Sequence, residues 1–264
     1  MRILIADSDG GCGPPSAILG RFLESLVERT GAARAVRVQW PAPGVITPRR
    51  SHTWETAAAA GVADLNRLVR LHPSDLLVLV GVCSGSRVIY DWLEANPEQL
   101  DRVAVVGMVG DPFRPRDKWL PGTQDPGGQG VAGRRLGPIP DRTYWVAVPG
   151  DPLSAIQADS LLRSAVRGSD LAPDQVYDDI LDDLPGSRAK MAARLDGLHH
   201  PGDWATNLRR RVDEAREALE RYRSLDYATR YESNENGPSP YERLVTLLAA
   251  EASRGGVAGS SAAP

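Results

Sequence analysis

Short, uninterrupted apolar runs alternate with amphipathic segments along the first 165 residues, and this alternation limits the folds open to the chain. The runs are MRILIA, AVRVQW, DLLVLVGV, RVAVVGMVG and YWVAVPG, and the segments that follow them have the spacing of helices with one apolar face. Strands that are apolar on both faces belong to a parallel sheet covered by helices on each side. The sequence therefore predicts an α/β fold, a doubly wound parallel sheet over residues 1–165.

The remainder of the chain has a different character. Residues 166–235 are polar and helical in spacing and predict a helical insert, and residues 236–252 predict a loop and a helix that returns to the core. Residues 253–264, SRGGVAGSSAAP, predict a disordered tail. The segment from Phe113 to Arg142 is rich in Gly and Pro and, at about 30 residues, is too long for a simple connection, so we expect it to fold over a functional face.

Composition excludes several classes of function. A net charge of −3 gives no electrostatic reason to expect nucleic acid as a partner. No apolar stretch approaches the ~20 residues that span a bilayer, so we expect no integral membrane insertion. The start, MRILIADSDG, lacks the long apolar region of a secretory signal, which predicts synthesis in a cytoplasm without a signal peptide. Two cysteines are too few for a zinc site or a disulfide framework, and we expect no metal and no cofactor.

One turn carries most of the chemical information. Residues 81–85, GVCSG, follow the third predicted strand, precede a predicted helix, and fit the G-x-nucleophile-x-G turn with Cys83 as the nucleophile. The amide of Ser84 and an amide in the loop after the first strand, at Asp9, are the expected oxyanion donors. A helix N-terminus below Cys83 would lower the pKa of its thiol. The alternative is that Cys83 is only a small buried hydrophobe.

Five stretches resemble one known family. They are VLVGVCSGSRVI, VGMVGDPFRP, GGQGVAGRR, WVAVPGDPLSAI and HHPGDWATNLRRRVDEA, and they occur in the order found in the lysin B proteins of actinobacterial phages. Those proteins are cutinase-like α/β hydrolases that cleave the ester between mycolic acids and arabinogalactan. The resemblance implies a cutinase-like α/β-hydrolase fold with a helical linker insert, and an esterase that acts on mycolyl-type lipid esters of the cell envelope.

The same resemblance assigns the remaining members of a catalytic triad. Asp151, in WVAVPGDPLSAI, would be the acid; by itself it reads as an ordinary turn aspartate. The family's histidine lies in a Gly-Pro-His loop, and this chain has NGPSPYERL there, with Ser239 in the histidine slot. His199 and His200 are the histidines that follow Asp151; His200 is the candidate base, although both fall in the region that resembles the insert.

Three hypotheses follow from these substitutions. The first is a thiol esterase that uses Cys83, Asp151 and a base from His199 or His200, with thioesters or activated esters as the more reactive substrates. The second is a catalytically inactive hydrolase-fold protein with a structural or host-surface-binding role in a phage particle, which could also contact other phage proteins. The third is a disulfide between Cys12 and Cys83 that would remove the nucleophile. The protein would act at the cell envelope after lysis or be carried in a virion.

Overall fold

The computed structural model describes residues 2–11, 17–32, 34–41, 52–135, 137–182, 204–234 and 237–260. Within them, five parallel strands form one sheet in the order β2-β1-β3-β4-β5. The strands are β1 (Arg2–Ala6), β2 (Ala35–Arg37), β3 (Leu77–Val82), β4 (Val103–Val109) and β5 (Thr143–Val146). The doubly wound parallel sheet predicted from the apolar runs is confirmed.

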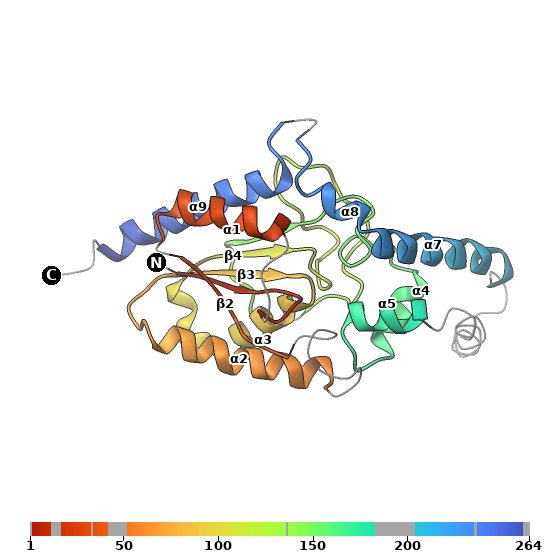
Figure 1. Ribbon diagram of the computed structural model, residues 1–264, viewed down its shortest axis with the longest axis horizontal. Helices are drawn as coiled ribbons and strands as arrows, with labels where there is room; N and C mark the ends of the chain where they lie inside the picture. Colours follow the sequence, from red (N-terminus) through yellow and green to blue (C-terminus); the bar gives the residue numbers. More distant parts are fainter. Residues whose placement is uncertain are drawn as a thin grey trace.

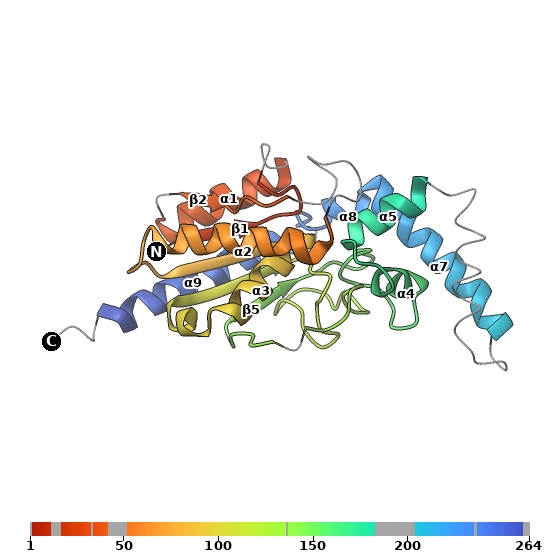
Figure 2. The ribbon, with the colours of Figure 1, turned by 90° about the horizontal axis from the view of Figure 1, so that it is seen from below.

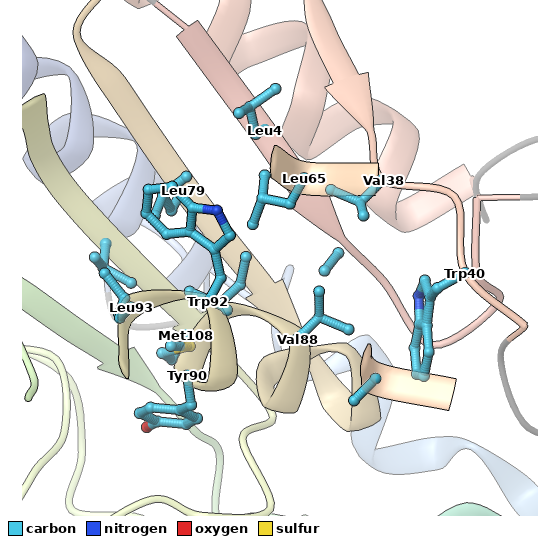
Figure 3. Close-up of a cluster of buried hydrophobic side chains, with 14 of the residues drawn as sticks. Leu4, Val38, Trp40, Leu65, Leu79, Val88, Tyr90, Trp92, Leu93 and Met108 are labelled. Carbon is cyan, nitrogen blue, oxygen red and sulfur yellow. The ribbon is translucent and has the colours of Figure 1, made fainter. Parts of the chain in front are cut away.

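Helices cover both faces of this sheet (Figure 1). On one side lie α1 (Ala17–Thr30) and α9 (Pro240–Ser260), and on the other α2 (Trp54–Arg70) and α3 (Ser86–Ala95). A short 3-10 helix, η2 (Pro97–Arg102), precedes β4. The core residues alternate between the two faces: Ile3 and Ile5 pack in the cluster with α1 and α9, whereas Leu4 packs in the cluster with α2 and α3. Figure 3 shows the second cluster, in which Trp92 of α3 lies near Leu79 of β3.

Strand length follows position in the sheet. Every residue of β3 and β4, at the centre, is buried, as their continuous apolar runs predicted. The run AVRVQW forms only the three-residue edge strand β2, whose residues are half-buried. An edge strand pairs on one side alone, so fewer hydrogen bonds extend it.

Further helices lie beyond the carboxyl ends of the strands (Figures 1 and 2). They are α4 (Leu161–Arg167), α5 (Pro173–Asp182), α7 (Trp204–Ser224) and α8 (Asp226–Thr229). The apolar faces of α4, α5 and α7 form a separate cluster with Val131, Leu153 and Ile156. We call these three helices the cap. The cap is held to the sheet through the loops that leave β4 and β5.

Two helices differ in extent from the sequence analysis. The helical spacing that began at Pro152 yields a helix only from Leu161, because Ser160 caps it by accepting from the amide of Leu162 at 3.3 Å. Helix α9 continues past residue 252 to Ser260, so the tail predicted as disordered from residue 253 is helical over 253–260. The hydroxyl of Ser253 donates to the carbonyl of Ala249, one turn earlier in the helix, at 2.9 Å. Residues 261–264 lie outside the described residues.

A buried guanidinium organises the Gly- and Pro-rich segment after β4. Arg114 is almost fully buried and donates to five backbone carbonyls, those of Pro115, Lys118, Gly127, Gly128 and Ser154, at 2.6–3.2 Å. The same segment bonds to its neighbours through its backbone, for example from the amide of Val131 to the carbonyl of Leu153 at 2.8 Å. A segment without periodicity is thus fixed in place by one side chain. Among the described residues, no helix is both long and apolar enough to cross a membrane.

We predict that Arg114→Lys lowers the free energy of unfolding by about 3 kcal/mol, because an ammonium cannot reach all the carbonyls that the guanidinium satisfies. Urea unfolding followed by circular dichroism measures the change. Arg116→Lys, in the same segment but exposed, is the matched control and should stay within about 0.5 kcal/mol of the parent. Equal stability of the two variants would contradict the organising role of Arg114.

Candidate active site

The turn after β3 has the geometry of a nucleophile elbow. Cys83 has a φ of +49°, a left-handed conformation that is unfavourable for a residue with a Cβ, and α3 begins at Ser86 directly after the 3-10 turn η1 (Cys83–Gly85). The glycines on either side are sterically required. A Cβ at Gly81 would lie 2.7 Å from Cα of Ser86, and one at Gly85 would overlap the carbonyl oxygen of Ala6. The strand, turn and helix predicted from the sequence are confirmed.

Cys83 lies where ligands bind in open parallel sheets. It follows the carboxyl end of β3, next to β1, and the strand order reverses between these two strands. Its side chain is half-buried, is a free thiol, and packs against both the apolar cluster under α1 and α9 and the cluster of the cap. Cys12, the other half of the disulfide considered above, lies outside the described residues.

Asp151 is buried in the turn after β5, and its carboxylate accepts four hydrogen bonds. Oδ1 accepts from the amides of Leu153, at 2.7 Å, and Ser154, at 3.2 Å. Oδ2 accepts from the Ser154 hydroxyl at 2.7 Å and from the phenol of Tyr231. A carboxylate offers about four lone-pair positions. A histidine could therefore be oriented by Asp151 only if one of these four donors were displaced.

Gly110 brings the thiol and the carboxylate together. It has a φ of +59°, and a Cβ at this position would lie 3.3 Å from Sγ of Cys83 and 3.4 Å from both Oδ2 of Asp151 and the hydroxyl of Tyr231. The absence of a side chain at Gly110 thus allows all three groups to face one point. Cys83 and Asp151, predicted as partners, do converge at Gly110, and the hydroxyl that bonds to Asp151 there is that of Tyr231.

Tyr231 was not predicted from the sequence. It follows α8, lies fully inside the protein, and stacks on Tyr241 with ring centroids 5.3 Å apart. Nothing in the local sequence distinguishes it from the other tyrosines, because its contact with Asp151 joins residues 80 positions apart. Burial and the neighbouring Asp151 carboxylate raise the pKa of Tyr231 far above its usual range. Its phenol therefore keeps its proton, donates a hydrogen bond to the carboxylate, and is not available as a base.

Ser239, in the histidine slot, is a helix cap. Its hydroxyl accepts from the amide of Glu242 at 3.2 Å, and the Glu242 carboxylate accepts from the amide of Ser239 at 2.7 Å. This reciprocal pair is a capping box at the start of α9. The pattern Ser-x-x-Glu before an apolar run could have been recognised in the sequence. Ser239 thus has a local structural role that accounts for it without catalysis.

The histidines give no base among the described residues. His52 and His72 are exposed, and Nδ1 of His72 lies 3.8 Å from a carboxylate oxygen of Asp75. His199 and His200 lie outside the described residues, so the role of His200 stays a prediction.

Ser84 is buried beside the elbow, and its side chain links the elbow to the cap. Its hydroxyl donates to Oδ2 of Asp174, the second residue of α5, at 3.2 Å, and its carbonyl accepts from the indole of Trp54 at 3.2 Å. Burial raises the pKa of Asp174 to about 6, and its other oxygen, Oδ1, has no hydrogen-bond partner. The oxyanion role predicted for the Ser84 amide stays a prediction.

Asp9 is not placed to serve as the second oxyanion donor. Its amide donates to Oδ1 of Asp7 at 3.2 Å, and its carboxylate pairs with Arg37 and accepts from the amide of Gly11 at 2.8 Å. These contacts hold the amide and the carboxylate of Asp9 within its own loop. The prediction for Asp9 is corrected because Asp7, buried at the end of β1, captures the amide that was expected to face the oxyanion.

The electrostatic surroundings of Cys83 are the opposite of those predicted. Burial raises the pKa of the thiol well above its usual range, and the carboxylates of Asp151, Asp174, Asp7 and Asp111 raise it further. The expected lowering by the helix N-terminus is overcome, because an anion at Sγ would face these carboxylates in a poorly solvated place. Cys83 is therefore a protonated thiol at neutral pH.

No family model and no curated protein matches the sequence. Among solved structures, the chain is similar to lysin B from mycobacteriophage D29, at 14% identity over 93% of this chain and 97% of that one, with a TM-score of 0.48. It is also similar to the acetyl xylan esterase core of Trichoderma reesei (15% identity, 63% and 91% coverage, TM-score 0.44). A cutinase-like protein from Cryptococcus sp. shares 18% identity over 66% and 89%, with a TM-score of 0.37.

The fold is that of an α/β hydrolase. The parallel sheet, its strand order and the elbow after β3 carry this assignment. A shared fold does not by itself assign an activity, so the function has to be argued from the site.

We predict that iodoacetamide alkylates Cys83 slowly between about pH 7 and 8.5 in the folded protein and faster only above the ordinary thiol pKa of about 8.5, because only the thiolate reacts. The measurement uses a Cys12→Ser background and mass spectrometry, with the urea-unfolded protein as the control. Alkylation at pH 7 as fast as in the unfolded chain would contradict the raised pKa.

We predict that Ser239→Ala lowers the free energy of unfolding by about 1 kcal/mol, because α9 loses its N-cap. Ser253→Ala, an exposed serine in the same helix, is the matched control and should change stability by less than about 0.5 kcal/mol. Indistinguishable urea midpoints for the two variants would show that Ser239 is not an effective cap.

Proposed function

We propose that this chain is a hydrolase-fold protein that binds acyl esters at the elbow. Cys83 does not contribute to any hydrolysis of these esters. The ligand class we propose is the lipid ester of an actinobacterial cell envelope, of which mycolyl esters are the type, and the role is host-surface binding or assembly in a phage particle. The ligand class and the role rest on the sequence resemblance to lysin B proteins.

One observation carries this proposal: the Asp151 carboxylate has all its lone-pair positions occupied, one of them by Tyr231. In a triad the acid orients a histidine, and the histidine takes the proton of the nucleophile. Here the group that faces both Asp151 and Cys83 is a phenol whose pKa lies far above neutrality. A phenol held in this state cannot accept the proton of Cys83.

The state of Cys83 supports the same conclusion. A thiol can attack without a base only when part of it is thiolate, and the carboxylates around Cys83 favour the protonated form. Cleavage of an alkyl ester also needs an acid to protonate the leaving alkoxide. Without a base, both proton transfers would be lost at once, and the described residues place no histidine beside Cys83.

The apolar surroundings of Cys83 support binding. Its half-buried side chain lies between the cluster under α1 and α9 and the cluster of the cap, and Tyr231 and Tyr241 stack within the first of these. Aromatic and aliphatic groups of this kind suit an acyl chain.

A thiol esterase is the second candidate, and the backbone of Cys83 favours it. A left-handed φ at a residue other than glycine costs about 1–2 kcal/mol, and such strain is typical of functional positions. This candidate requires His199 or His200 to supply the base, and it would act best on thioesters or activated esters.

Hydrolysis of p-nitrophenyl butyrate and of a butyryl thioester distinguishes the two candidates. We expect the wild-type protein in reductant to be as slow as Cys83→Ala, within about twofold, because the thiol is protonated and the described residues give it no base. Cys83→Ser is the isosteric control. A rate that falls at least tenfold in Cys83→Ala, and equally in His200→Ala, would overturn the proposal and establish the thiol esterase.

Binding is measured separately, by calorimetry with monodecanoyl glycerol below its micellar concentration. We expect saturable binding to the wild-type protein and a clear loss of affinity in Cys83→Trp, which places a bulky group at the elbow. Unchanged affinity in Cys83→Trp would exclude the elbow as the acyl site.

A further inference from the structure

A cavity of about 480 Å³ lies beside Trp54, whose indole donates to the carbonyl of Ser84 in the elbow. Its walls come from the start of α2, from α3, from the Gly- and Pro-rich segment after β4, and from the chain that joins α4 to α5. Cys83 is not among its lining residues. The Gly- and Pro-rich segment was expected to fold over a functional face, and here it lines a cavity together with three arginines, Arg87, Arg135 and Arg167. We call it the arginine cavity.

Two stacked aromatic rings form the inner wall of the arginine cavity. Trp54 and Phe113 lie with ring centroids 5.0 Å apart and planes 12° from parallel. The guanidinium of Arg87 lies 5.1 Å from the centroid of Trp54, and that of Arg135 lies 5.5 Å from the centroid of Phe113. Trp54 is fixed from behind by its bond to the Ser84 carbonyl. The wall is therefore rigid, and its cations are held against it by cation–π contacts.

The three arginines of the arginine cavity differ in whether a carboxylate pairs with them. Arg87 pairs with Asp91 at 3.3 Å, and Arg135 pairs with Asp91 and also with Glu94, at 3.2 Å. Arg167 is exposed at the end of α4, and the described part of the chain gives it neither an ion pair nor a hydrogen bond. The cavity is thus lined by one guanidinium whose five donors have no partner among the described residues.

A glycine and a second arginine lie near Arg167. The guanidinium of Arg167 lies against Gly133, where a Cβ would be 2.9 Å from Nη2. Arg163, one turn earlier in α4, is buried and donates to the carbonyl of Gly130. Glu55 and Asp170 also line the cavity, and they restrict the ligand to one that presents its negative charge toward Arg167 and Arg135.

We infer that the arginine cavity is a binding site for a small amphiphile with an oxyanion head group, a phosphate or a carboxylate, and an apolar body. The guanidinium of Arg167, together with Arg135, would hold the head group, since the guanidinium fork matches the geometry of these anions. The apolar body would lie on Trp54, Phe113 and the aliphatic residues Ala132, Val166 and Leu171. The volume is within the range of small-molecule sites.

This site is independent of the function proposed for the elbow. Cys83 lies among carboxylates, which repel an anion, whereas the arginine cavity offers the guanidinium of Arg167, which has no ion pair among the described residues. A variant that alters the thiol should therefore leave the cavity unchanged, and the two proposals can fail separately.

Isothermal titration calorimetry with decyl phosphate, decanoate, decanol and inorganic phosphate tests the inference, with each amphiphile kept below its micellar concentration. We expect decyl phosphate or decanoate to bind at one site, more weakly at high salt, and decanol and inorganic phosphate to bind at least about tenfold more weakly. Arg167→Gln should weaken the anionic amphiphile about tenfold, because it removes a charge-assisted hydrogen bond.

Three further variants locate the site. Ala132→Leu narrows the cavity without touching a charge and should also weaken binding. Arg70→Gln, an exposed arginine at the end of α2, and Cys83→Ala should bind as the wild type does. Wild-type affinity in Arg167→Gln, equal binding of decanol and decyl phosphate, or no binding of either anionic amphiphile would overturn the inference. Binding of inorganic phosphate as tight as that of decyl phosphate would overturn the apolar part of the site.

Discussion

The hydrogen bonding of the Asp151 carboxylate determines what this protein can do. Two backbone amides, the Ser154 hydroxyl and the Tyr231 phenol fix the turn after β5 and connect it to the segment after α8. Because the carboxylate is buried, each of these donors offsets part of its desolvation. The same saturation means that Asp151 could orient a base only if one of these donors were displaced. The arrangement that stabilises the site is thus also the one on which the proposed loss of triad chemistry rests.

The elbow and the arginine cavity differ in the charged groups that surround them. Cys83 lies among carboxylates and tyrosines, so its neutral thiol is favoured. Arg87, Arg135 and Arg167 line the arginine cavity together with Glu55 and Asp170, and its aromatic wall is bonded to the elbow through Trp54. The elbow and the cavity thus share one structural support, and we propose a neutral acyl ligand for the first and an anionic head group for the second.

Much of the fold could be predicted because its signals are local. Continuous apolar runs produced the buried central strands β3 and β4, and Gly81 and Gly85 produced the sharp turn that Cys83 occupies. Ser239 and Glu242 form a capping box whose pattern is also local, although the family resemblance directed attention to Ser239 as a vacant histidine position. The sequence predicted too long a helix at α4. Residues before Ser160 also have helical spacing, but Ser160 is the N-cap, so the helix begins only after it.

The sequence by itself determined the α/β class, the elbow, and the positions of Cys83 after the third apolar run and of Asp151 after the fifth, because strand periodicity and turn glycines act within a few residues. Only the tertiary structure decided the protonation of Cys83, the pairing of Asp151 with Tyr231, and the gathering of three arginines around one cavity. These depend on burial and on contacts between residues far apart in the chain. No local pattern encodes such contacts, since they exist only after the sheet, the cap and the Arg114 segment have packed together.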